Sequence, residues 1–326
     1  MELRKDPITR SWVVIGPGEG TAPGVDPCPL CPGSPGAQTL LALPAGADPW
    51  RVRVCPHIAP LYQIEGEIGR AAEGIYDRMR SVGAHEIVIE TPDHTRPLSR
   101  LRDEEIDLVL SAYSARITDL KRDSRFKYIT VFKNQGEQAG AEWTHAYSQV
   151  TATTFVPRRI LYELRASREY FRHKERCVFC DIVRQEEKQG KRVIDTQGDY
   201  VAFCPYASRV PYETWIMARK HNHQFEVQRP GANRHNLATL LGRLLRRFEK
   251  ISESYHMVLH TTPNTLEKLG ELQEYWKTIA EDYHWHMEVM PILPAGRRSY
   301  ALKEVYFNQM FPEQAAERLR ALESNP

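Results

Sequence analysis

Hydrophobic and polar positions recur in the same order in the two halves of the chain. Short apolar runs typical of β-strands occupy residues 51–55 and 86–90 in the first half, and residues 200–204 and 214–218 in the second. Apolar residues at spacings of three and four then predict a helix in each half, near residues 101–110 and 237–244. The pattern predicts two α+β units, at residues 1–155 and 177–326, joined by a charged linker helix at residues 156–176.

The six cysteines support this duplication. Cys177, Cys180 and Cys204 each lie 149 residues after a counterpart, which is Cys28, Cys31 or Cys55. A constant offset over three pairs indicates an internal repeat with divergent loops. In a reducing compartment, the Cys-x-x-Cys spacing is typical of half of a metal site rather than of a disulfide.

Composition narrows the class of protein. The chain has 326 residues, of which 41% are hydrophobic, and its 44 basic and 42 acidic residues leave a net charge of +2. This balance gives no basic surface for nucleic acid or for an anionic membrane. The charged N-terminus does not resemble a signal peptide, and no run of about 18 apolar residues occurs. We therefore expect a soluble, cytoplasmic protein that binds neither nucleic acid nor a membrane.

Each half also offers two cysteines and two histidines in the same order. A Cys2His2 set leaves no coordination position for water and is typical of structural zinc, because thiolate and imidazole suit a borderline-soft cation. Buried thiols and core histidines are the alternative interpretation, and we interpret Cys55 and Cys204 in that way. The sequence predicts two zinc ions per chain, with the ligands Cys28, Cys31, His94 and His145, and Cys177, Cys180, His221 and His284.

With these residues, the chain resembles the galactose-1-phosphate uridylyltransferase family of the histidine triad superfamily. The resemblance implies two histidine-triad-like repeats, antiparallel sheets forming a half-barrel with flanking helices, zinc and a homodimer. It also implies transfer of a nucleoside monophosphate between a nucleotide sugar and a sugar phosphate through a covalent nucleotidyl-histidine. Among the motifs that carry it are Thr91-Pro-Asp-His94, Phe132-Lys-Asn134, Gly136, Cys177-Val-Phe-Cys180 and His284-Trp-His286.

The chain departs from the family where the chemistry takes place. The family motif His-Pro-His-x-Gln is replaced by His145-Ala-Tyr-Ser-Gln149, so that Tyr147 stands at the position of the nucleophilic histidine. With a reference pKa near 10, only about 0.1% of a tyrosine is ionised at pH 7. Glu142 stands where family members place a phosphate-binding serine, residues 15–23 lack the usual arginines, and His57-Ile-Ala59 replaces the element that holds the nucleoside.

We therefore expect a zinc-containing, uridylyltransferase-like enzyme whose substrate is a phosphorylated or nucleotide-like small molecule. One alternative is a repurposed enzyme on the same zinc scaffold, with different chemistry in a specialised biosynthetic pathway. The other is a binding protein without catalysis. The expected catalytic residues are Tyr147, Glu142, Gln149 and His286, and the expected substrate-binding residues are His57, Arg78, Asn134 and Gly136.

Overall fold

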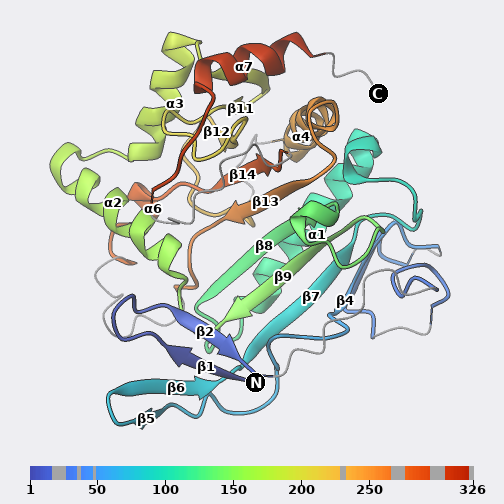
Figure 1. The fold of residues 1–326 in the computed structure, drawn as a ribbon, viewed down its shortest axis with the longest axis vertical. Coiled ribbons are helices and arrows are strands. Elements are labelled where there is room, and N and C mark those ends of the chain that lie inside the picture. Colours follow the sequence, from blue (N-terminus) through green and yellow to red (C-terminus); the bar gives the residue numbers. More distant parts are fainter. Residues whose placement is uncertain are drawn as a thin grey trace.

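The main sheet of the protein has ten antiparallel strands (Figure 1). The computed structural model describes residues 1–16, 27–34, 38–46, 49–227, 233–265, 276–293 and 305–322. The strand order is β10-β11-β12-β14-β13-β8-β9-β7-β4-β3. The strands of the first half are β3 (Leu41–Leu43), β4 (Val52–Pro56), β7 (Gly83–Ile89), β8 (Tyr128–Gln135) and β9 (Tyr147–Thr153). Those of the second half are β10 (Val193–Gln197), β11 (Tyr200–Phe203), β12 (Thr214–Ala218), β13 (Tyr255–His260) and β14 (His286–Pro291).

This strand order reflects the repeat. The first-half strands β3, β4, β7, β9 and β8, taken from one edge inward, correspond to β10, β11, β12, β14 and β13 taken from the other edge. The halves meet where β8 pairs with β13, from Gln135 opposite Tyr255 to Val131 opposite Leu259. The α+β fold with antiparallel strands is confirmed, and the two expected sheets are joined edge to edge into one open sheet. The proposed unit boundaries flank helix α2 (Arg158–Lys174) and stay a prediction.

The main core lies on one face of this sheet. Helices α1 (Asp103–Leu120), α4 (Arg234–Glu249) and α7 (Pro312–Ala321) contribute to it together with the inward side chains of the strands. The apolar spacing predicted for the helices is confirmed, since Ile106, Val109 and Leu110 in α1 and Leu237, Leu240, Leu241 and Leu244 in α4 are all buried.

Two smaller clusters cover the other face. Over the second half lie α2, α3 (Val178–Gln189) and α6 (Ile279–Asp282). Over the first half, Leu30 and Trp143 pack against strand residues. Because successive strand residues point to opposite faces, β9 directs Tyr147 and Gln149 toward this second face, while Ser148 contacts Tyr113 of α1 at 2.6 Å between hydroxyl oxygens. The expected site is thus separated from the main core by the sheet.

A second sheet of four strands lies beside the first half (Figure 1). Its order is β2 (Trp12–Ile15), β1 (Glu2–Lys5), β6 (Tyr76–Arg80) and β5 (Ala71–Glu73). The fold also contains two short 3-10 helices, η1 (Leu98–Arg100) and η2 (Glu137–Ala139). Among the described residues, no helix combines the length and the apolar character needed to cross a bilayer.

Glu105 stabilises the start of α1. Its carboxylate accepts hydrogen bonds from the Arg102 backbone N–H at 2.9 Å and from Arg96 Nη2 at 2.8 Å. Although burial opposes the effect, these hydrogen bonds lower the pKa of Glu105 to about 2. An acid with a lowered folded-state pKa adds stability above its unfolded pKa and loses it as the pH falls toward the folded pKa.

We expect Glu105→Gln to lower the free energy of unfolding by about 1 kcal/mol at pH 7, because an amide accepts weaker hydrogen bonds from arginine than a carboxylate does. Urea denaturation of both proteins at pH 7 and at pH 3 measures the difference. It should shrink at pH 3, and an equal difference at both pH values would contradict the ionic role.

Candidate functional site

The four predicted ligands of the first half converge beside the start of β9. Cys28 and Cys31 lie on one turn, His94 follows β7 and His145 precedes β9, and their ligand atoms lie within 4.8 Å of one another. Cys31 Sγ is 3.3 Å from His94 Nδ1 and 3.6 Å from His145 Nδ1. His145 Nε2 is 2.7 Å from the Thr91 carbonyl oxygen, to which it must donate its proton, so the lone pair of Nδ1 faces the thiols.

The second half repeats this arrangement. Cys177, Cys180, His221 and His284 again place their ligand atoms within 4.8 Å of one another. His221 Nε2 donates to the Ala280 carbonyl at 2.9 Å, and its Nδ1 lies 3.3 Å from Cys180 Sγ. The hydrogen bond from Cys177 lowers the pKa of the Cys180 thiol. A thiolate facing imidazole lone pairs is a donor set for a cation.

Both sets fit zinc. Zinc ligands are thiolates and neutral imidazoles, and a ligating histidine commonly donates its other N–H to a backbone carbonyl, as His145 and His221 do. The described residues therefore contain two Cys/His groups able to hold a metal ion, as the spacing predicts. Cys55 and Cys204 are buried and lie outside both groups.

Two histidines of the first half stack against each other: His57 directly follows β4, and His85 lies on β7. The rings of His57 and His85 are 4.0 Å apart between centroids and nearly parallel. The backbone N–H groups of Ala59 and Leu61 donate to their Nδ1 atoms, each at 3.1 Å. Each ring therefore carries its proton on Nε2, and burial lowers both pKa values, that of His85 to about 4.

His85 orients the amide of Gln149. His85 Nε2 lies 2.7 Å from Gln149 Oε1, and because this nitrogen carries the proton, it donates to the amide oxygen. The NH2 group of Gln149 is thereby directed away from His85. The predicted glutamine is thus held in the orientation that presents a donor rather than an acceptor.

Tyr147 and Glu142 belong to the same cluster. The backbone N–H of Glu142 donates to the Tyr147 hydroxyl oxygen at 2.9 Å, and the Trp143 ring packs edge-on against Tyr147. Tyr147 is only 1% exposed, and burial raises its pKa to about 12. This shift is the opposite of what a tyrosine nucleophile requires, since the reactive form is the phenolate.

Glu142 itself approaches His57. Its Oε1 lies 3.4 Å from His57 Nε2, and its side chain is 33% exposed. The structure thus brings His57, Glu142, Tyr147 and Gln149 together. Residues 17–26, which include most of the segment without arginines, lie outside the described residues.

The other predicted residues lie elsewhere. Asn134 on β8 pairs with His256 on β13, with Oδ1 and Nδ1 2.9 Å apart. Gly136 precedes η2 with φ of +80°, and a Cβ there would meet Ser254 Oγ at 2.3 Å, so a residue with a side chain does not fit at this position. Arg78 is exposed on β6 and pairs with Glu2 at 3.4 Å, outside the cluster around Tyr147.

His286 belongs to a third cluster, in the second half. It joins Glu163, His260 and Glu288 in a group whose candidate ligand atoms lie within 4.8 Å of one another. Its Nε2 is 4.0 Å from Glu163 and 3.9 Å from Glu288, and burial lowers its pKa to about 4. Two carboxylates around this nitrogen disfavour a phosphate group there.

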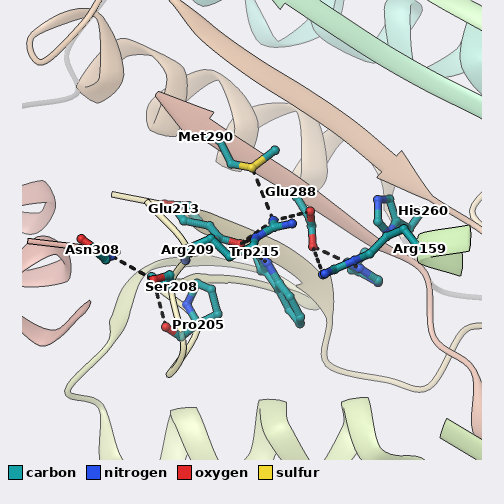
Figure 2. A network of polar contacts seen from close by, with 12 residues as sticks. Arg159, Pro205, Ser208, Arg209, Glu213, Trp215, His260, Glu288, Met290 and Asn308 are labelled. Atoms are coloured by element: carbon teal, nitrogen blue, oxygen red, sulfur yellow. Dashed lines mark hydrogen bonds and ion pairs between the residues drawn. The ribbon is translucent and has the colours of Figure 1, made fainter. Parts of the chain in front are cut away.

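Two arginines compensate the carboxylates of the third cluster. Arg209 and Arg159 reach the Glu288 carboxylate from two sides (Figure 2). Their Nη2 atoms lie 2.6 and 3.3 Å, respectively, from its oxygens. Arg209 also binds Glu213 at 2.6 Å, and Arg159 binds Glu163 at 2.9 Å. The cluster is therefore a dense ionic network. Its members His286 and Glu288 stand in the second half where Tyr147 and Gln149 stand in the first.

Sequence reasoning missed several of these residues. The available signal for His85 was a histidine on a mainly apolar strand, β7. Glu288 stands two residues after His286, as Gln149 stands two after Tyr147, and this spacing pointed to it. Glu163 and Arg159 lie in α2, where nothing in the charged pattern distinguishes them from surface residues.

Known proteins match the chain over both halves. Residues 62–157 match the N-terminal domain of galactose-1-phosphate uridyl transferase, and residues 163–325 match its C-terminal domain. An ADP-glucose phosphorylase of Arabidopsis thaliana is 29% identical over 338 residues, which cover 98% of this chain and 92% of that protein. A galactose-1-phosphate uridylyltransferase of Thermotoga maritima is 25% identical over 336 residues, with 99% of each covered.

Solved structures agree with these matches. A uridylyltransferase structure has a TM-score of 0.81 at 27% identity, with 98% of each chain covered. The crystal structure of an Arabidopsis thaliana ADP-glucose phosphorylase with bound ADP-glucose has a TM-score of 0.77 at 29% identity, with 99% of each covered. In fold, in repeat order and along nearly its whole length, the chain belongs to the galactose-1-phosphate uridylyltransferase family.

Proposed function

We propose that the protein is a zinc-containing enzyme that transfers a nucleotidyl group from a nucleotide sugar to an acceptor. Its reaction centre is formed by His57, Glu142, Tyr147 and Gln149. The orientation of Gln149 carries this proposal: because His85 donates to its Oε1 at 2.7 Å, the amide NH2 group is available to donate to an oxygen of the α-phosphate. Relatives named for nucleotide-sugar reactions support the substrate class.

Zinc has a structural role in this proposal. Four protein ligands leave no open coordination position, so the ion supplies no Lewis acid to the substrate. In the first half, Cys28, Cys31, His94 and His145 would hold it and thereby tie the cysteine turn to the residues after β7 and before β9. Two zinc ions per chain, a homodimer and a cytoplasmic location complete the proposal. None of the six cysteines, all of which lie in the described part of the chain, forms a disulfide, and this supports a reducing compartment.

A second candidate is a binding protein that does not catalyse transfer. The observation that favours it is the state of Tyr147, which is 1% exposed and whose oxygen accepts the Glu142 N–H. A side chain held in this way is poorly placed to attack phosphorus. A repurposed enzyme with unrelated chemistry is the third interpretation, and it differs in that nucleotide sugars would neither bind nor react.

Calorimetry and turnover assays with ADP-glucose, UDP-glucose and glucose 1-phosphate separate these candidates. We expect one nucleotide sugar to bind and to release its sugar phosphate, and Gln149→Met to lower kcat about 100-fold because it removes one donor to the phosphate. Gln138→Met, at an exposed position of η2, is the matched control.

Intact-protein mass spectrometry in the same incubations locates any covalent intermediate. An adduct on Tyr147 would restore the family mechanism at that residue, and one on His286 would move the site to the second half. Binding without turnover would favour the second candidate. Absence of both binding and turnover with all three compounds would contradict the proposed function.

A further inference from the structure

Tyr147 holds a loop in place. Its hydroxyl oxygen accepts the Glu142 backbone N–H at 2.9 Å, and its ring contacts Trp143, with ring centroids 5.1 Å apart. These contacts fix the segment that leads from η2 into β9. At the position where the family has its nucleophile, this chain has a residue that positions Glu142 and Trp143.

Glu142 is the most exposed member of the cluster formed by His57, Glu142, Tyr147 and Gln149. Its side chain is 33% exposed, whereas that of His57 is 2% exposed. Its Oε1 lies 3.4 Å from His57 Nε2. The most exposed group is therefore a carboxylate, which accepts hydrogen bonds and protons but is repelled by phosphate oxygens.

One buried N–H donor, on His57, lies beside this carboxylate, and a second belongs to the neighbouring ring of Trp143. His57 Nδ1 accepts the Ala59 N–H, so its proton is on Nε2. Among the described residues, Trp143 Nε1 has no hydrogen-bond partner, and His57 Nε2 has only its long 3.4 Å contact with Glu142 Oε1. The rings of His57 and Trp143 are 5.5 Å apart between centroids. Buried donors are nearly always well paired in folded proteins, so one unpaired donor and one weakly paired donor on neighbouring rings indicate room for an acceptor atom.

A carboxylate next to an N–H donor is complementary to a hydroxyl group, which accepts one hydrogen bond and donates another. Resting on the function proposed above, we propose that Glu142 is the general base of this centre and that the acceptor substrate is a hydroxyl compound. The hydroxyl oxygen would accept from His57 Nε2 and donate to Glu142. The nucleotidyl group then passes directly to this hydroxyl, without a covalent enzyme intermediate.

The step balances without a further reactant. Glu142 takes the hydroxyl proton while the hydroxyl oxygen forms a bond to the α-phosphorus. The bond from phosphorus to the sugar phosphate breaks, and the sugar phosphate leaves with the electron pair as a stable anion that needs no proton. Glu142 then releases its proton to solvent. If the hydroxyl is water, the product is a nucleoside monophosphate; if it belongs to a sugar, the product is a phosphodiester.

Kinetics of Glu142→Gln with ADP-glucose and UDP-glucose test this assignment. The assays are run in ¹⁸O-labelled water, with and without added hexose, so that incorporation of ¹⁸O distinguishes water from a sugar hydroxyl as the acceptor. We expect kcat to fall at least 100-fold while KM stays within about threefold, because general-base catalysis contributes about 10²–10⁴. Glu142→Asp should recover part of kcat. Glu137→Gln, an exposed change in η2, is the control.

Two further measurements separate this inference from the function on which it rests. Radiolabelled glucose 1-phosphate should not exchange into ADP-glucose when no acceptor is added, and Tyr147→Phe should lower kcat less than tenfold. Exchange, or full kcat in Glu142→Gln, would overturn the inference while leaving the enzyme a transferase. If the wild-type protein converts none of the substrates, the proposed function fails and direct transfer fails with it.

Discussion

Replacing Cys180 with serine is expected to remove one of two zinc ions per chain. It should also lower the free energy of unfolding more than Arg209→Met or Glu105→Gln does. Cys180 is the sulfur that faces both histidines of its group, at 3.3 Å from His221 Nδ1 and 3.5 Å from His284 Nδ1. A serine hydroxyl is not a ligand that zinc selects. Because structural zinc contributes about 10–16 kcal/mol in small domains, we expect a loss of about 5–10 kcal/mol here, where a hydrophobic core remains.

Metal analysis by mass spectrometry and thermal unfolding measure this effect. Wild-type protein should contain two zinc ions per chain, and Cys180→Ser and Cys31→Ser should contain one each. Cys55→Ala and Cys204→Ala are the matched controls, since both residues are buried cysteines outside the two groups, and their zinc content should stay at two. A wild-type content near zero would refute the metal prediction.

Arg209→Met is expected to have the second largest effect on stability. Arg209 binds both Glu213 and Glu288 at 2.6 Å, and both carboxylates are almost completely buried (Figure 2). Methionine keeps the aliphatic length but leaves two buried negative charges without this partner. Removing one member of a buried ionic network costs about 3–5 kcal/mol, and we expect a loss in that range at pH 7.

Urea denaturation and the melting temperature measure this loss, which corresponds to a decrease in Tm of about 4–7 °C. The difference from wild type should shrink as the pH falls, because Arg209 helps to lower the pKa of Glu288 in the wild-type protein and a buried carboxylate without this partner is protonated more readily. Arg219→Met is the control, since its ion pair with Glu187 is partly exposed and worth at most about 1 kcal/mol. If Arg209→Met also lost only about 1 kcal/mol, the prediction would be wrong, and Arg159 alone would be sufficient to compensate the charge of Glu288.

The two halves keep the same scaffold but differ at equivalent positions. On β9, Tyr147 and Gln149 share a face with the stacked imidazoles, while on β14, His286 and Glu288 share a face with His260. In the first half the neighbouring groups are neutral donors and one half-exposed carboxylate. In the second half they are arginines and carboxylates that neutralise one another. This difference in charge explains why we place the reaction in the first half.

The sequence by itself determined the duplication, two strands and one helix in each half, and the eight candidate metal ligands. These follow from local periodicity and from spacing, and the constant offset of 149 residues linked the cysteine pairs without a structure.

The tertiary structure decided which residues act together. His57 meets Glu142, His85 meets Gln149, and Arg209 meets Glu288 across 64 to 85 positions of sequence. Such pairs depend on the order and register of the strands and on the path of the loops, which periodicity does not specify. Burial and backbone hydrogen bonds, which set the proton positions on His57 and His85 and hold Tyr147 in the interior, exist only once the chain is folded.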